Sequence, residues 1–135
     1  MTNLLDLTGF RVDDVPDVSR FIDRVREFAA GDLEAAHFWV VAAGPTDVRH
    51  EDHVELEFGV STAPGVAALT FGQRDGQYVP AGGTNEDEVD YQLAGLHPSY
   101  LPPGAEVPLP DMLTALEEFL RTHQRPTSIT WVPAD

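Results

Sequence analysis

The sequence contains no cysteine and no lysine, and all eight of its basic residues are arginine. The absence of cysteine excludes disulfides, zinc sites built from thiolates and catalysis by a thiol nucleophile. No apolar run approaches the roughly 20 residues that a membrane-spanning helix needs, and no basic segment of the signal-peptide kind opens the sequence. We therefore expect a cytoplasmic protein that does not act at a membrane.

Positive charge is scarce as a whole. Eight basic residues face 23 acidic ones, which gives a formal net charge of -15. Such a charge repels nucleic acid and anionic membranes and attracts basic proteins. Solubility or adaptation to salt also produces acidic surfaces without any partner, so composition alone leaves both interpretations open.

Two segments carry apolar residues at helical spacing. Residues 15–30 have such a stripe, with Asp13 or Asp14 as the cap of the helix. Residues 110–124 have another, and Pro110 suits its first turn because the missing N–H of proline is no loss there. Both segments are predicted to be amphipathic helices that each cover a flat apolar surface.

Most of the remaining chain shows strand patterns. They cover, in chain order, residues 4–12, 37–43, 53–60, 65–71, 77–80, 89–93 and 128–132. The four prolines of residues 97–108 predict an irregular connection, held down by Leu96, Tyr100 and Leu101. We predict one α+β domain over residues 1–135, with an antiparallel sheet of about six strands and two amphipathic helices packed on one face.

Side chains that hold metals or perform catalysis occur without the spacing that those roles need. His50 and His53 are three residues apart in a turn that leads into a strand, so they do not share a face, and no zinc-binding motif accompanies them. The acids of residues 86–90 lack the ligand spacing and the central glycine of a calcium loop. No serine lies in a G-x-S-x-G motif. The sequence therefore predicts no catalytic residue, no metal and no cofactor.

The closing segment, residues 105–131, reads AEVPLPDMLTALEEFLRTHQRPTSITW. Leu116 and Trp131 fall on its apolar side, and we expect both to be buried against the sheet. With its proline before the helix, its Glu-Phe-Leu end and the Arg-Pro ahead of Ile-Thr-Trp, the segment resembles the immunity protein one family, small antitoxins of bacterial polymorphic-toxin systems. FGQRDGQYVPAGG at residues 71–83 looks like the central hairpin of that family. The N-terminal third is similar only in general layout.

The resemblance implies a single α+β domain that is not an enzyme. Such a protein binds and blocks a toxin domain, often one that attacks nucleic acid, such as a deaminase. The expected partner is a basic toxin domain, with no nucleic acid and no membrane, and the chain itself is expected to be a monomer or a weak dimer. The alternative is a small acidic α+β enzyme or ligand-binding domain, which a deep pocket with a strongly perturbed titratable group would favour.

Acidic residues on two strand patterns suggest where a partner binds. The carboxylates of residues 55 and 57 point to the wet side of one strand, those of residues 86–90 stand at the start of another, and the two groups merge if those strands are neighbours. Aromatic anchors of the kind that interfaces favour are available in Trp39, Tyr78, Tyr91 and Tyr100. A plain acidic surface with buried tyrosines is the competing interpretation. The predicted toxin-binding residues are Glu55, Glu57, Glu86, Asp87, Glu88, Asp90 and Tyr91.

Overall fold

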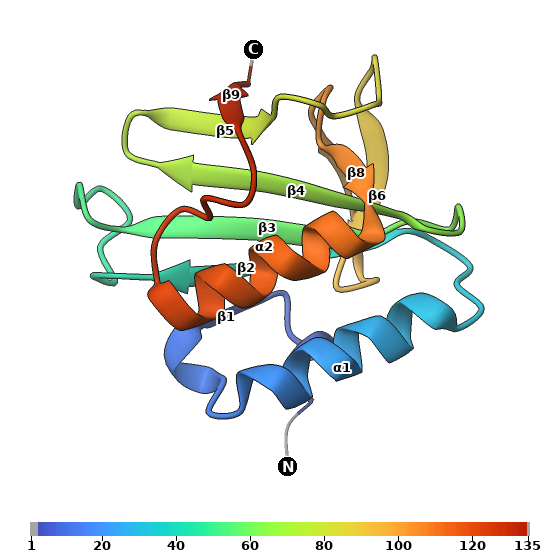
Figure 1. Ribbon diagram of the computed structural model, residues 1–135, viewed down its shortest axis with the longest axis horizontal. Coiled ribbons are helices and arrows are strands. Elements are labelled where there is room, and N and C mark those ends of the chain that lie inside the picture. Colours follow the sequence, from blue (N-terminus) through green and yellow to red (C-terminus); the bar gives the residue numbers. More distant parts are fainter. Residues whose placement is uncertain (1–2, 135) are drawn as a thin grey trace.

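The chain folds into a curled sheet with both long helices on one of its faces (Figure 1). The computed structural model describes residues 3–134, so residues 1, 2 and 135 of the predicted domain lie outside the described part. Three strands form the middle of the sheet and pair antiparallel in sequence order: β2 (His37–Ala43), β3 (Val54–Val60) and β4 (Val66–Gln73). These strands confirm the patterns at residues 37–43, 53–60 and 65–71.

Four further strands extend the middle of the sheet in the order β7-β6-β2-β3-β4-β5-β9, and two short ones pair beside it. Their bounds are β1 (Gly9–Arg11), β5 (Gly76–Pro80), β6 (Val89–Leu93), β7 (His97–Leu101), β8 (Glu106–Pro108) and β9 (Trp131–Pro133). β1 and β6 each pair with β2 in parallel, while β8 pairs antiparallel with β4. The sheet is therefore mixed and not antiparallel, because long-range parallel pairs leave no hairpin signal in the sequence. It also has more strands than predicted, since β7 and β8 were not expected.

The first helix, α1 (Val18–Ala30), begins later than its stripe suggested. Its cap is Asp17, whose side chain accepts a hydrogen bond from the Arg20 amide at 3.1 Å. The predicted cap at Asp13 or Asp14 is wrong, since both residues belong to a short 3-10 turn, η2 (Val12–Asp14). Another 3-10 turn, η1 (Leu4–Asp6), precedes β1, so the strand predicted over residues 4–12 shrinks to the three residues of β1.

The second helix, α2 (Leu109–Thr122), has Pro110 in its first turn, as predicted. It ends two residues before the predicted limit, because His123 adopts a left-handed conformation with φ 61°. The apolar stripe of α2 is buried and consists of Met112, Leu113, Ala115, Leu116, Phe119 and Leu120. No helix within residues 3–134 is long and apolar enough to cross a membrane.

The core lies between the helices and the inner face of the sheet. Leu116 is fully buried there, as predicted, whereas Trp131 is only half-buried and donates its indole N–H to the Pro126 carbonyl at 2.9 Å. The strand predicted over residues 128–132 is correspondingly shorter, since β9 covers only its last two residues and Pro133.

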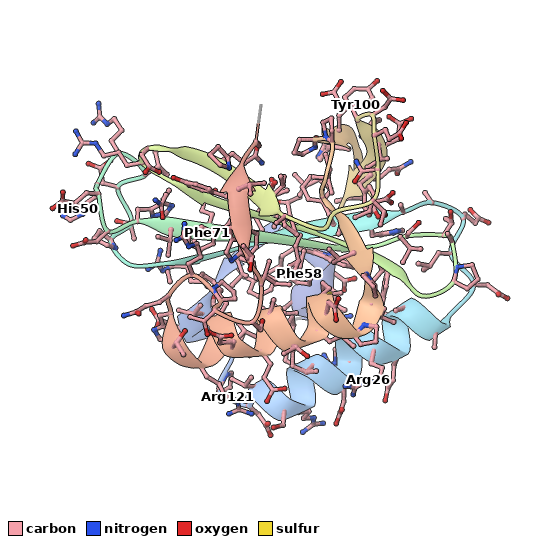
Figure 2. All side chains as sticks on the ribbon, turned by 45° about the horizontal axis from the view of Figure 1, so that its top comes forward. Arg26, His50, Phe58, Phe71, Tyr100 and Arg121 are labelled. Carbon is pink, nitrogen blue, oxygen red and sulfur yellow. The ribbon has the colours of Figure 1, made fainter. Side chains whose placement is uncertain are left out.

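A second apolar cluster covers part of the opposite, outer face of the sheet. Its buried members are Phe38, Ala68, Val79, Tyr91, Leu101 and Ala105. The β6–β7 hairpin folds over Gly59 of β3 here, and a Cβ on Gly59 would lie 2.7 Å from the His37 carbonyl oxygen and 3.0 Å from the Tyr91 ring. The hairpin therefore rises from the sheet on the side away from the helices (Figure 2).

The proline-rich residues 97–108 contain β7 and β8 and are not the irregular connection that was predicted. Pro98 is tolerated because β7 is an edge strand, where a missing N–H breaks no ladder hydrogen bond if it faces outward. Leu101 is buried as expected, but Leu96 and Tyr100 are 63% and 66% exposed. These two side chains therefore do not hold the segment down.

Candidate interaction surface

Glu55 and Glu57 lie on the outer face of the sheet, because alternate residues of β3 enter the core. The Glu57 carboxylate accepts hydrogen bonds from the Thr70 hydroxyl and, at 3.2 Å, from the Gln77 side-chain amide. Burial raises the pKa of Glu57, the charge of Glu55 adds to the effect, and the two hydrogen bonds oppose it. Glu57 is thus engaged inside the molecule, which leaves Glu55 as the more open of the two.

His53 joins the turn before β3 to the same face. Its side chain is nearly buried, with Nε2 2.8 Å from Glu55 Oε2 and Nδ1 2.6 Å from the Pro45 carbonyl oxygen. Burial lowers the pKa of His53, but the hydrogen bonds to Glu55 and Pro45 outweigh burial, and the net shift is upward. With acceptors at both ring nitrogens, His53 serves the fold of this turn.

His50 stands apart from His53. It is exposed and accepts a hydrogen bond from the Asp52 amide at 3.0 Å. Among residues 3–134, no group of three or more histidine, aspartate or glutamate side chains is arranged to hold a metal ion.

Tyr91 of β6 faces inward and is 1% exposed. Its hydroxyl donates to Glu106 Oε2 at 2.8 Å, which connects the hairpin to β8. Burial, followed by the hydrogen bond and charge of Glu106, raises the pKa of Tyr91. The ring therefore anchors the β6–β7 hairpin from within, and the outward positions of β6 are Asp90 and Gln92.

The loop before β6 is organised around Asn85. Its side-chain oxygen accepts from the Glu106 amide at 2.8 Å, and its side-chain nitrogen donates to the carbonyls of Asp87 and Pro102 at 2.8 and 3.0 Å. These bonds fix the loop against the connection between β7 and β8. The adjoining acidic residues of the loop are exposed: Glu86, Asp87 and Glu88.

The predicted carboxylates form two groups, because the strands that carry them are not neighbours. β2 lies between β3 and β6, and β6 joins β2 at His37, which is opposite Val60. Glu55 is five residues from Val60, or roughly 16 Å along the strand. We call Glu55 and Glu57 the outer-face pair, and Glu86, Asp87, Glu88 and Asp90 the hairpin acids.

The arginines lie elsewhere on the molecule. No basic residue occurs between Arg74 and Arg121, a stretch that includes all four hairpin acids. Figure 2 shows Arg26 and Arg121 on the helix side and Tyr100 at the far end of the hairpin. Even on the helices the arginines have partners, since Arg26 pairs with Asp23 at 2.7 Å and Arg121 with Glu117 at 3.0 Å. The hairpin end of the molecule therefore carries negative charge without a compensating arginine.

An open groove of about 380 Å³, which no sequence pattern predicted, lies beside the hairpin acids. Carboxylates from three separate segments line it, namely Glu34, Asp90 and Glu106, together with the Ser61 side chain. Only the curl of the sheet brings residues so distant in sequence together. No local pattern signals such a groove.

Of the aromatic residues considered as anchors, one is open to solvent. Trp39 and Tyr91 are buried, and Tyr78 is half-buried with the Arg125 guanidinium carbon 5.3 Å from its ring centroid. Tyr100 is 66% exposed. It is therefore the available aromatic side chain on this end of the molecule.

Comparison with protein-family models matches residues 8–133 to the model described as immunity protein Imm1. No curated protein matches the chain.

Proposed function

The chain belongs to the immunity protein Imm1 family, and from this premise we propose that it neutralises a cognate toxin domain by binding it, without catalysing a reaction. Family membership over residues 8–133 is the observation that carries the proposal. An immunity protein has a toxin as its partner, and occupying the toxin is enough to protect the cell. The proposed complex is stoichiometric.

The toxin is proposed to be basic and to act on nucleic acid, as a deaminase does. A domain that holds a polyanion needs a positively charged cleft. A protein with a net charge of -15 is steered toward the same cleft, which accelerates association. Charge therefore supports direct competition for the site where the toxin holds its substrate.

The hairpin acids are proposed to supply most of this steering, with the outer-face pair as a secondary contribution. The four hairpin acids are exposed and have no arginine beside them in sequence from residue 75 to residue 120. Glu57, by contrast, already accepts hydrogen bonds from Thr70 and Gln77. Tyr91 contributes from inside, because its bond to Glu106 holds the hairpin in place.

The test compares two variants with equal net charge. One neutralises the hairpin acids: Glu86→Gln, Asp87→Asn, Glu88→Gln and Asp90→Asn. The control neutralises four exposed acids near or on α1: Asp6→Asn, Asp13→Asn, Asp23→Asn and Glu27→Gln. Each is assayed for rescue of cell growth when the toxin domain encoded beside this gene is expressed, and for its association rate with an inactive form of that domain.

The hairpin variant should associate about tenfold more slowly at low salt and show a weaker dependence on salt, because steering acts on the association rate. The control should stay close to the wild type. Equal effects in both variants would mean that only the total charge matters. A wild-type protein that neither binds the toxin nor rescues growth would contradict the proposed function itself.

A further inference from the structure

The outer side of the β6–β7 hairpin is a sheet face that no other part of the described chain covers. Residues whose side chains face outward there alternate with buried ones, since Tyr91 and Leu101 point inward. We call this surface the hairpin face; it comprises Asp90, Gln92, Pro98 and Tyr100, and the turn at one end of it carries Leu96. Asp90, Leu96, Pro98 and Tyr100 are exposed.

The hairpin face combines apolar and acidic groups. Three large apolar side chains in residues 3–134 are more than 60% exposed, and two of them, Leu96 and Tyr100, lie on this hairpin. The residue opposite Tyr100 in the register is Asp90, so a carboxylate lies directly across from the ring. An aromatic ring next to a carboxylate is a favourable site for a cationic side chain, because the face of the ring and the carboxylate both attract positive charge.

The hairpin is also held firmly, which limits the loss of freedom on binding. The Gln92 and Ala94 amides donate to the carbonyls of Ala36 and Phe38 at 2.7 and 2.8 Å. In the turn, Gly95 has φ +74°, and a Cβ there would lie 2.4 Å from His37 Nε2. The turn therefore packs directly against the His37 ring.

The free edge of β7 is poorly suited to the addition of a strand. The Gln92 and Ala94 amides bond toward β2, so the backbone groups of the alternate residues Tyr91 and Leu93 face β7. Pro98 is opposite Gln92 and Tyr100 is opposite Asp90. The backbone groups of Pro98 and Tyr100 therefore face the free edge. Pro98 has no N–H to donate. A partner is therefore held by side chains on the hairpin face and not by extension of the sheet.

A second copy of the chain fits this face badly. A two-fold interface applies the same patch to itself, so the hairpin acids of two copies would meet. Like charges across an interface are costly, and the nearest arginines in sequence are Arg74 and Arg121. Charge complementarity favours a basic partner.

From these observations we infer that Tyr100 is the anchor of the toxin interface, and that its ring receives an arginine or lysine side chain of the toxin. This inference rests on the proposed function and adds to it a division of roles. The hairpin acids act on the association rate, while the anchor acts on the lifetime of the complex. Such a division is expected where a few desolvated aromatic residues carry most of the affinity.

The experiment measures binding kinetics with the inactive toxin domain encoded beside this gene. Tyr100→Ala should raise Kd about 30-fold, mainly through faster dissociation, which is the size expected of an interface hot spot. Tyr100→Phe keeps the ring and should stay within about threefold of the wild type. Val48→Ala is the matched control, because Val48 is 64% exposed but follows β2 in the loop that contains His50.

Figure 2 shows His50 at the left end of the molecule and Tyr100 at the top, right of centre, so the two residues are well separated and Val48→Ala should leave both rate constants unchanged. Unchanged thermal unfolding of the three variants establishes that each one is folded. If the wild type binds and Tyr100→Ala binds equally well, the anchor is overturned while the proposed function stands. If sedimentation shows a dimer of the chain that Tyr100→Ala dissociates, the face belongs to self-association and the inference is overturned. If the wild type fails to bind, both proposals are overturned.

Discussion

The position of the hairpin depends on Gly59, and Gly59→Ala is the change that tests this dependence. A Cβ at residue 59 would lie 2.7 Å from the His37 carbonyl oxygen, 2.9 Å from Phe38 Cβ and 3.0 Å from Tyr91 Cδ2. Two of these atoms belong to the rigid part of β2, and the Tyr91 ring is tied to Glu106. The methyl group therefore has to displace the hairpin or strain the sheet.

The magnitude follows from comparison with Gly82→Ala. Gly82 has no heavy atom within 4 Å of the position a Cβ would take, and its φ is not positive. Alanine there should be neutral or should stabilise the protein by about 0.4 to 1 kcal/mol, because it reduces the conformational entropy of the unfolded chain. The same gain applies to Gly59→Ala, but overpacking a closely packed site costs about 1 to 3 kcal/mol. The difference between the two variants should therefore be about 1 to 3 kcal/mol.

Guanidinium unfolding monitored by tryptophan fluorescence measures this difference, provided that the dependence on denaturant stays the same in both variants. Gly59→Ala should also lose affinity for the toxin, because it moves the hairpin face. If Gly59→Ala proves as stable as Gly82→Ala, the hairpin does not pack on β3 as described.

Two further substitutions test the core and the outer face. Leu116→Ala should lower the free energy of unfolding by about 2 to 5 kcal/mol in a denaturant titration, since Leu116 is fully buried, and a loss well under 1 kcal/mol would mean that another face of α2 packs on the sheet. Glu57→Gln should stabilise the protein at pH 8 and lose that advantage as the pH falls toward 4. Burial raises the pKa of Glu57, so its carboxylate weakens the fold above the folded-state pKa, whereas below the unfolded value the acid is neutral in both states. An advantage that grows in acid would contradict this sign.

The two helices and the middle strands were predictable because each depends on a pattern within its own segment. The stripes of α1 and α2 and the alternation in β3 follow from one face being apolar. The hairpin that the family resemblance implied within residues 71–83 is formed by β4 and β5. The prediction of an irregular connection over residues 97–108 was wrong, because the prolines suggested a loop where β7 and β8 form. Pro98 is compatible with a strand because β7 lies at the edge of the sheet, where the missing N–H of proline breaks no ladder hydrogen bond.

The candidate surface was only partly predictable. The acidic character of residues 86–90 is visible in the sequence, and so is the alternation that turns Tyr91 inward. The exposure of Tyr100 depends on β7 forming, and the separation of Glu55 from Asp90 depends on β2 lying between their strands. The separation follows from long-range pairing, for which a single sequence carries no periodic signal. β7 pairs locally with β6, but the prolines of this segment hid its strand character.

Amide hydrogen–deuterium exchange of the free protein and of its complex with the inactive toxin domain would show whether the toxin binds at the β6–β7 hairpin. We expect slower exchange on binding in residues 84–101, which contain the hairpin acids and the hairpin face, and no change in α1. Protection confined to the exposed sides of α1 and α2, with residues 84–101 unchanged, would contradict this expectation.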